Sequence, residues 1–165
     1  MLVLIVLSPA KRLDFESAPR ALPVTTPTLA EEAAGLMEVS KRLKPSDLQD
    51  LMGISESLAE LNHARFQEMS PAGAPERSRP AALAFKGDVY LGLDADSLSD
   101  DDLTWAQDRI GILSGLYGIL RPLDLIQPYR LEMGTRLQNP RGPNLYKYWG
   151  TRVSEEVHAR LGDHP

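Results

Sequence analysis

The segment Leu113–Gly134 carries the residue types that best suit contact with a phosphate backbone. Gly115 and Gly118 permit tight turns and close approach to a partner, and backbone N–H groups freed at such a turn bind phosphate oxygens. Arginines add positive charge, and tyrosine rings offer faces on which bases stack. The side chains of these two kinds in the segment are Tyr117, Arg121, Tyr129 and Arg130. Together they suggest a helix-hairpin-helix element that binds DNA by its backbone.

A structural interpretation of the same segment stays open beside the first. Gly115 and Gly118 lie three residues apart, whereas the usual hairpin sets its glycines two apart. In this second interpretation the glycines bend a strand, and Arg121 pairs locally with Asp124. The chemistry of the residues alone does not separate the two.

Two other motifs place a lysine at the end of an apolar run. Lys86-Gly87-Asp88 predicts a tight turn whose lysine could meet a phosphate, and it is not a P-loop because the full G-x-x-x-x-G-K-[ST] pattern is absent. Ser8-Pro9-Ala10-Lys11 has the S-x-x-K spacing of serine acylases, in which the lysine takes the hydroxyl proton. The companion motifs S-D-N and K-T-G are absent, so a strand end that turns into a loop is favoured.

Metal and thiol chemistry have little support in the sequence. The chain has no cysteine, which excludes disulfides, Cys-ligated zinc and a thiol nucleophile. His63, His158 and His164 do not have the spacing of metal ligands. Asp100–Asp102 fit the first turn of a helix, where the macrodipole favours carboxylates. We therefore expect no metal, no cofactor and no catalytic residue.

The composition predicts one domain, residues 1–165, with an apolar core. Of its 165 residues 42% are hydrophobic, and the net charge of −5 argues against an all-over basic coat but not against a local basic patch. The apolar run Met1–Leu7 is far shorter than the roughly 20 residues that span a bilayer, and it lacks a basic start. We expect a cytoplasmic protein that does not enter the membrane.

Hydrophobic periodicity and capping residues predict the elements that position these motifs. Leu2–Leu7 is expected to form a strand buried on both faces, and Ala81–Phe85 a short apolar strand. The expected helices run from the Thr28 cap to Leu43, from Pro45 to Met52 with Gly53 as the stop, from Ser55 with Leu58 and Leu61 inward, from Ser99 to Arg109, and from Asn144 to Leu161.

The sequence as a whole resembles the YaaA family of bacterial peroxide-stress proteins. The resemblance rests on segments in the family's order: Leu4–Asp14, Leu83–Tyr90, Leu113–Gly134 and Leu145–Gly150. Family members continue well beyond Pro165, so this chain is expected to be the N-terminal part of a longer family domain, with an incomplete sheet and cleft.

The resemblance implies an α+β fold in which helices surround a mixed sheet of unusual topology, with a helix-hairpin-helix-like element beside a positive cleft. It implies binding to DNA and protection of DNA and protein when hydrogen peroxide meets intracellular iron. Four residues fall in the implied hairpin region: Gly115, Tyr117, Gly118 and Arg121. Three fall in motifs expected to line the cleft: Lys11, Lys86 and Arg130.

Two alternatives to a DNA-binding stress protein remain. The first is an enzyme or small-ligand protein whose cleft is formed by Lys11, Lys86, Asp88 and Arg130, because charged residues end apolar runs at three motifs, as in active sites. The second is an interaction protein whose glycine and proline motifs only shape the fold. In that case substitutions at Gly115 and Trp149 would lower stability.

Overall fold

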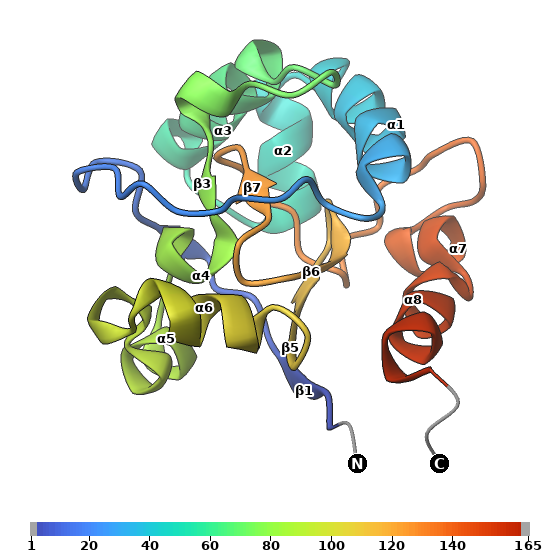
Figure 1. Ribbon diagram of the computed structural model, residues 1–165. Helices are drawn as coiled ribbons and strands as arrows, with labels where there is room; N and C mark the ends of the chain where they lie inside the picture. Colours follow the sequence, from blue (N-terminus) through green and yellow to red (C-terminus); the bar gives the residue numbers. More distant parts are fainter. Residues whose placement is uncertain (1–2, 163–165) are drawn as a thin grey trace.

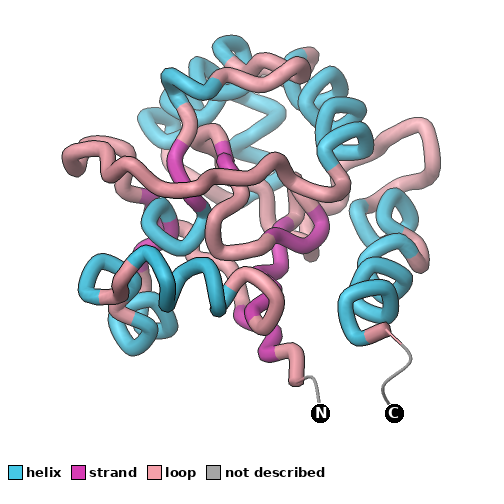
Figure 2. Tube along the Cα trace, in the orientation of Figure 1, coloured by secondary structure: helices cyan, strands magenta, loops and turns pink. Residues whose placement is uncertain are grey.

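The computed structural model describes residues 3–162, so Met1, Leu2 and the predicted surface histidine His164 lie outside the described part. It confirms an α+β fold (Figures 1 and 2). The helices are α1 (Ala30–Lys41), α2 (Pro45–Met52), α3 (Glu56–Glu68), α4 (Ala81–Ala84), α5 (Asp88–Leu93), α6 (Asp100–Ala106), α7 (Leu145–Trp149) and α8 (Arg152–Leu161), with short 3-10 turns at η1 (Pro75–Arg77) and η2 (Ala95–Ser97). The strands are β1 (Ile5–Leu7), β2 (Arg12–Leu13), β3 (Arg79–Pro80), β4 (Phe85–Lys86), β5 (Ile110–Ser114), β6 (Gly118–Leu120) and β7 (Leu125–Ile126).

The strands join parts of the chain that lie far apart in sequence. β5 is the middle of a three-stranded sheet, parallel to β1 and antiparallel to β6. β2 pairs with β4, and β3 pairs with β7, both antiparallel. Figure 1 shows three groups of helices around these strands: α1 to α3, α5 with α6, and α7 with α8. None of the helices within residues 3–162 has the length and apolar character that crossing a membrane requires.

The N-terminal strand is less buried than its sequence suggests. Ile5–Leu7 forms β1, which within the described residues pairs with β5 alone. Val3 and Ile5 are each 52% exposed, and Val6 is 46% exposed. The prediction of a strand buried on both faces is therefore wrong for the described residues, because Ile5 and Val6 point to opposite faces of the strand and both stay exposed.

Residues 81–85 form a helix where a strand is expected. Ala81–Ala84 makes the single turn α4, and only Phe85 and Lys86 continue as strand β4. Alanine has the highest helix propensity, and the N–H groups of Ala81 and Ala82 donate to the carbonyls of Asp124 and Pro122. A run of small apolar side chains fits a buried helical turn as well as a strand, so periodicity did not distinguish them.

The predicted capping residues set the ends of most helices. Ser55, Ser99 and Asn144 each accept a hydrogen bond from the backbone three residues on, and Gly53 ends α2 in the left-handed conformation with φ +61°. Thr28 is the exception, because α1 begins at Ala30 and its preceding residue makes no side-chain cap.

The inward face of α3 differs from the predicted one. Leu58 and Leu61 are 39% and 46% exposed, whereas Ala59, Asn62 and Phe66 are buried. Successive residues on a helix are about 100° apart, so a face centred on these three turns both leucines toward solvent. The spacing of the leucines alone pointed to the wrong face.

The C-terminal helical pattern is broken in two. α7 ends at Trp149 and α8 begins at Arg152, because Gly150 takes φ +53° and turns the chain. Leu145 and Trp149 are buried in the core, while Val153, Val157 and Leu161 are half-buried. The single helix predicted from Asn144 to Leu161 is therefore two helices in different surroundings.

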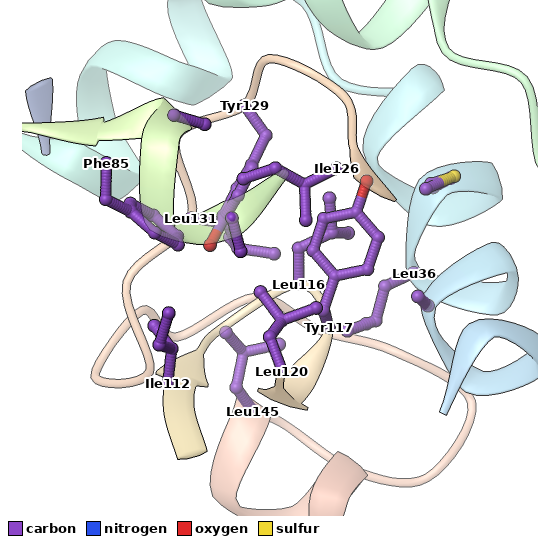
Figure 3. Close-up of a cluster of buried hydrophobic side chains, with 14 of the residues drawn as sticks. Leu36, Phe85, Ile112, Leu116, Tyr117, Leu120, Ile126, Tyr129, Leu131 and Leu145 are labelled. Carbon is purple, nitrogen blue, oxygen red and sulfur yellow. The ribbon is translucent and has the colours of Figure 1, made fainter. Parts of the chain in front are cut away.

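The core is centred on the β5–β6 turn and the strands that follow (Figure 3). Tyr117 and Tyr129 meet edge to face with ring centroids 5.6 Å apart, and the Tyr129 hydroxyl bonds Ser114. The indole N–H of Trp149 donates to the carbonyl of Gly115 at 2.9 Å. The turn is thus held by buried polar contacts as well as by packing.

Gly115→Ala is expected to lower the free energy of unfolding by roughly 3 kcal/mol. A Cβ at this position would overlap the carbonyl of Leu131, a backbone atom that cannot rotate away. Gly134→Ala is the control, since a Cβ at Gly134 meets nothing within 4 Å. Urea unfolding of both variants tests this, and equal stabilities would contradict the close packing at Gly115.

Candidate functional site

The segment that suggested a DNA-binding hairpin forms strands in the structure. β5 and β6 are joined by a tight turn, with Ser114 paired to Gly118, and β7 follows. Gly118 takes φ +75°, which favours glycine. A helix-hairpin-helix element within residues 113–134 is not confirmed. The arrangement matches the alternative of a glycine-bent strand.

Three of the predicted DNA-contacting residues lie in the core. Tyr117 is 3% exposed, and its hydroxyl accepts a hydrogen bond from the N–H of Gln127. Burial raises the pKa of Tyr117 far above its ordinary value. Gly115 and Gly118 are also buried, against Leu131 and Trp149. In this conformation neither the ring of Tyr117 nor the two glycines can reach a nucleic acid, so their contribution is to shape the fold.

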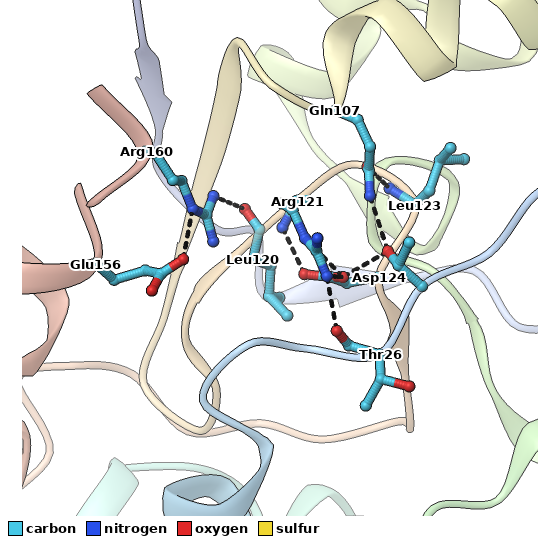
Figure 4. A network of polar contacts seen from close by, with 9 residues as sticks. Thr26, Gln107, Leu120, Arg121, Leu123, Asp124, Glu156 and Arg160 are labelled. Atoms are coloured by element: carbon cyan, nitrogen blue, oxygen red, sulfur yellow. Dashed lines mark hydrogen bonds and ion pairs between the residues drawn. The ribbon is translucent and has the colours of Figure 1, made fainter. Parts of the chain in front are cut away.

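Arg121 is engaged by a buried carboxylate (Figure 4). Asp124 is fully buried and accepts bonds from the Arg121 N–H at 2.7 Å, from the Arg121 guanidinium at 2.9 Å and from the Thr25 hydroxyl at 2.6 Å. Arg121 also donates to the carbonyl of Thr26. Gln107 extends the network by donating to Thr25 and accepting from the N–H of Leu123. Arg121 is therefore a structural ion-pair partner.

The two predicted cleft lysines lie in or next to the β2–β4 pair. Arg12 lies opposite Lys86 in this ladder, and Lys11 directly precedes β2. Lys11 pairs with Glu132 at 3.5 Å, and Lys86 lies 3.4 Å from Asp96. Because both ammonium groups face carboxylates, a phosphate there would have to compete with existing partners. Nucleic-acid contact by the two lysines stays a prediction.

The other two residues of the predicted cleft occupy different environments. Asp88 is exposed at the start of α5. Arg130 is half-buried, and its Nε has no hydrogen-bond partner among residues 3–162. Ser8, Pro9 and Ala10 are not helical, and the Ser8 carbonyl accepts a bond from Tyr90, so the one-turn geometry of an S-x-x-K acylase is not formed.

Asp14 lies between Lys86 and Arg79. It lies 3.9 Å from Lys86 and 3.8 Å from Arg79. Hydrogen bonds from the hydroxyl and N–H of Ser17 lower the pKa of Asp14 from its ordinary 3.8 to about 2, with a smaller contribution from Arg79. Asp14 is thus charged at neutral pH and orients cations on both sides.

A cavity of about 620 Å³ lies next to Asp14 and was not predicted from the sequence. Four arginines line it: Arg20, Arg65, Arg77 and Arg79. They come from the extended N-terminal segment, α3, η1 and β3. The only hint in the sequence is that Arg77 and Arg79 lie close together in the segment before Pro80. Nothing in the sequence indicates that Arg20, Arg65 and Arg79 line one cavity.

A second feature missed in the sequence is the helical hairpin of α2 and α3. The two helices pack on each other and are joined by Gly53, Ile54 and Ser55. The signal was available, because the sequence predicted both helices and the glycine stop between them. A short connection between two such helices is typical of an αα-hairpin.

Asp124→Asn is expected to lower the free energy of unfolding by roughly 3 kcal/mol. The amide would set an NH₂ group against the N–H donors of Arg121 and leave that guanidinium uncompensated in a site where the carboxylate is fully buried. Asp108→Asn, at an exposed position, is the control. Chemical denaturation of both tests this, and a loss no larger than in the control would contradict a structural role for the pair.

Asp14 predicts a defined loss of stability in acid. Its folded-state pKa of about 2 lies below its ordinary 3.8, so its contribution is complete above pH 4 and disappears as the pH falls toward 2. Stability of the wild type and of Asp14→Asn, measured by urea unfolding across this range, should converge as the pH falls. Asp108→Asn should show no such convergence, and a constant difference for Asp14→Asn would contradict the lowered pKa.

Comparison with known proteins identifies relatives along nearly the whole chain. The family model described as Peroxide stress protein YaaA matches residues 3–164. UPF0246 proteins of Burkholderia mallei (strain SAVP1) and Burkholderia pseudomallei (strain K96243) are each 53% identical over 159 residues, and one of Azoarcus sp. (strain BH72) is 52% identical. The matches cover 96% of this chain, which spans 61% of the length of these relatives. The chain belongs to the YaaA family of peroxide stress proteins.

Proposed function

We propose that this protein binds DNA by its backbone and limits the damage that hydrogen peroxide and iron cause to DNA and protein. Membership of the YaaA family supports the relation to peroxide stress. The DNA-binding part of the proposal rests on the hairpin of α2 and α3 and on the basic segment before it. We assign the contact to this hairpin in place of residues 113–134, whose glycines are buried.

The basic segment is the observation that carries the proposal. Lys41, Arg42 and Lys44 lie where α1 ends and α2 begins, and Arg42 and Lys44 are exposed. Within residues 3–162 none of the three forms an ion pair within 4.0 Å. Lys11 and Lys86, in contrast, already face carboxylates. Unpaired cations contact phosphates without first breaking a bond within the protein.

The hairpin turn offers a second point of contact. The first N–H groups of a helix have no partner within the helix, and Gly53, Ser55 and Ser57 at the start of α3 are exposed. α2 has eight residues and is about 12 Å long, which separates this turn from the basic segment. Measured along the DNA helix axis, where each strand has one phosphate per roughly 3.4 Å, this length corresponds to about three or four phosphates.

The triple variant Lys41→Gln, Arg42→Gln, Lys44→Gln is expected to bind duplex DNA more weakly and with less dependence on salt. Each lost phosphate contact should reduce the slope of log K against log salt concentration by about 0.9, so three lost contacts reduce it by about 2 to 3. Fluorescence anisotropy of labelled duplex over a range of KCl concentrations measures the slope.

A triple variant at Arg109, Arg136 and Lys147, also to Gln, removes the same charge elsewhere and should keep the wild-type slope. If the two triple variants bind alike, the hairpin is not the contact surface. A reduced slope in Lys11→Gln with Lys86→Gln would instead place the contact at β2 and β4. Survival in hydrogen peroxide of cells that carry each variant then tests whether protection follows DNA binding.

A further inference from the structure

The cavity beside Asp14 has a charged floor and an open rim. Its volume of about 620 Å³ lies within the range of small-molecule sites. The floor includes the buried residues Arg79 of β3, Leu83 of α4 and Gln127, which directly follows β7. Pro19 and Glu76 at the rim are exposed. Figure 1 shows the extended N-terminal segment passing β3 and β7. Residues of this segment, among them Phe15 and Arg20, line one side of the cavity.

Arg79 is the most unusual residue of the cavity. Its side chain is only 10% exposed, and its Nε is buried without a hydrogen-bond partner among the described residues. One terminal nitrogen donates to the carbonyl of Ser17 at 2.8 Å, and the other lies 3.8 Å from Asp14, beyond hydrogen-bond length. A buried guanidinium with an unused donor is costly unless an acceptor arrives from outside.

Arg65 supplies a second cation without a carboxylate partner. Its guanidinium donates only a long bond, 3.3 Å, to Asn62, and no acidic group of residues 3–162 lies within 4.0 Å of it. Burial lowers its pKa, but arginine stays protonated at neutral pH. Its charge is therefore uncompensated on the cavity wall.

The other two arginines are neutralised locally. Arg20 pairs with Asp100, and Arg77 lies between Glu68 and Glu76, at 3.9 and 3.7 Å. Arg79 shares Asp14 with Lys86, at 3.8 and 3.9 Å, and Arg65 has no carboxylate within 4.0 Å among residues 3–162. The lining, with four arginines and two glutamates, is therefore positive. Planar guanidinium groups bind carboxylate and phosphate oxygens in pairs, so the free charge fits an anionic group with at least two oxygens.

The apolar residues that line the cavity indicate what part of a ligand would lie beyond its anionic group. Phe15, Met69, Leu83 and Leu125 give it apolar walls. Gln127 is held in place, because its amide both donates to and accepts from the backbone of Ser70. We infer that the cavity is a binding site for a small organic anion, whose phosphate or carboxylate group lies on Arg65 and Arg79 and whose apolar body lies against these walls.

A terminal anionic group suits this cavity better than a strand of nucleic acid. The backbone of DNA continues in both directions from each phosphate, whereas a cavity of about 620 Å³ has the volume of a site for one small molecule. The inference does not rest on the proposed DNA binding, since α2 and the segment Lys41–Lys44 take no part in the lining.

Isothermal titration calorimetry with four related probes tests this inference. Phenyl phosphate and benzoate carry the same ring with different anionic groups, inorganic phosphate has no ring, and phenol has no anionic group. We expect saturable binding of phenyl phosphate or benzoate, with the tighter of the two identifying the preferred anion. Inorganic phosphate and phenol should each bind at least about tenfold more weakly.

Arg65→Gln should weaken the preferred probe at least about tenfold while leaving the thermal unfolding temperature close to that of the wild type, since its one bond to Asn62 is long. Arg79→Gln should also weaken binding of the probe, but the contact of Arg79 with Ser17 supports the fold as well. The Arg65→Gln variant is therefore the decisive test of the inference. Arg136→Gln, at an exposed site, should bind like the wild type.

Three results would overturn the inference. The first is an absence of saturable binding of all four probes up to about 10 mM. The second is equal binding by the wild type and Arg65→Gln. The third is displacement of the probe by duplex DNA together with loss of DNA binding in Arg65→Gln, which would make the cavity part of a nucleic-acid surface.

Discussion

The buried carboxylate of Asp124 is the interaction on which the arrangement of this fold depends. It accepts bonds from Arg121 and Thr25, and its backbone carbonyl accepts from Ala81 at the start of α4. Thr25 and Asp124 also pair through their backbones, and Gln107 at the end of α6 donates to Thr25 and accepts from the N–H of Leu123. This network thus joins four distant parts of the chain, and the buried charge of Asp124 is tolerated because its carboxylate accepts hydrogen bonds from Arg121 and Thr25.

This network also positions the arginine-lined cavity. The extended N-terminal segment is fixed at Thr25 by Asp124 and at Ser17 by Arg79, so it is held over β3 and β7 although it has little regular structure of its own. A segment fixed at both ends can close a cavity without the hydrogen bonds of a helix or sheet. The side chain that anchors one of those ends, Arg79, also lines the cavity, and its Nε has no hydrogen-bond partner among residues 3–162.

The cations of the protein divide into two groups with different consequences. Lys11, Lys86 and Arg121 are matched by carboxylates and hold the structure together. Among residues 3–162, Lys41, Arg42 and Lys44 on the surface and Arg65 in the cavity have no carboxylate within 4.0 Å, and Arg79 shares Asp14 with Lys86. With a net charge of −5, contact with anions depends on such local unmatched cations rather than on the field of the whole molecule.

The sequence by itself determined the family, the α+β class, and the ends of helices where Gly53, Ser55, Ser99 and Asn144 act through neighbouring backbone atoms. These are local effects, so local patterns suffice to predict them. Tertiary structure alone decided that β1 lies at an edge, that Gly115, Gly118 and Tyr117 are buried, and that Arg65 and Arg79 line one cavity. Each depends on strand pairing or packing between segments distant in sequence, such as β3 with β7, and one chain's hydrophobic pattern does not specify its partners.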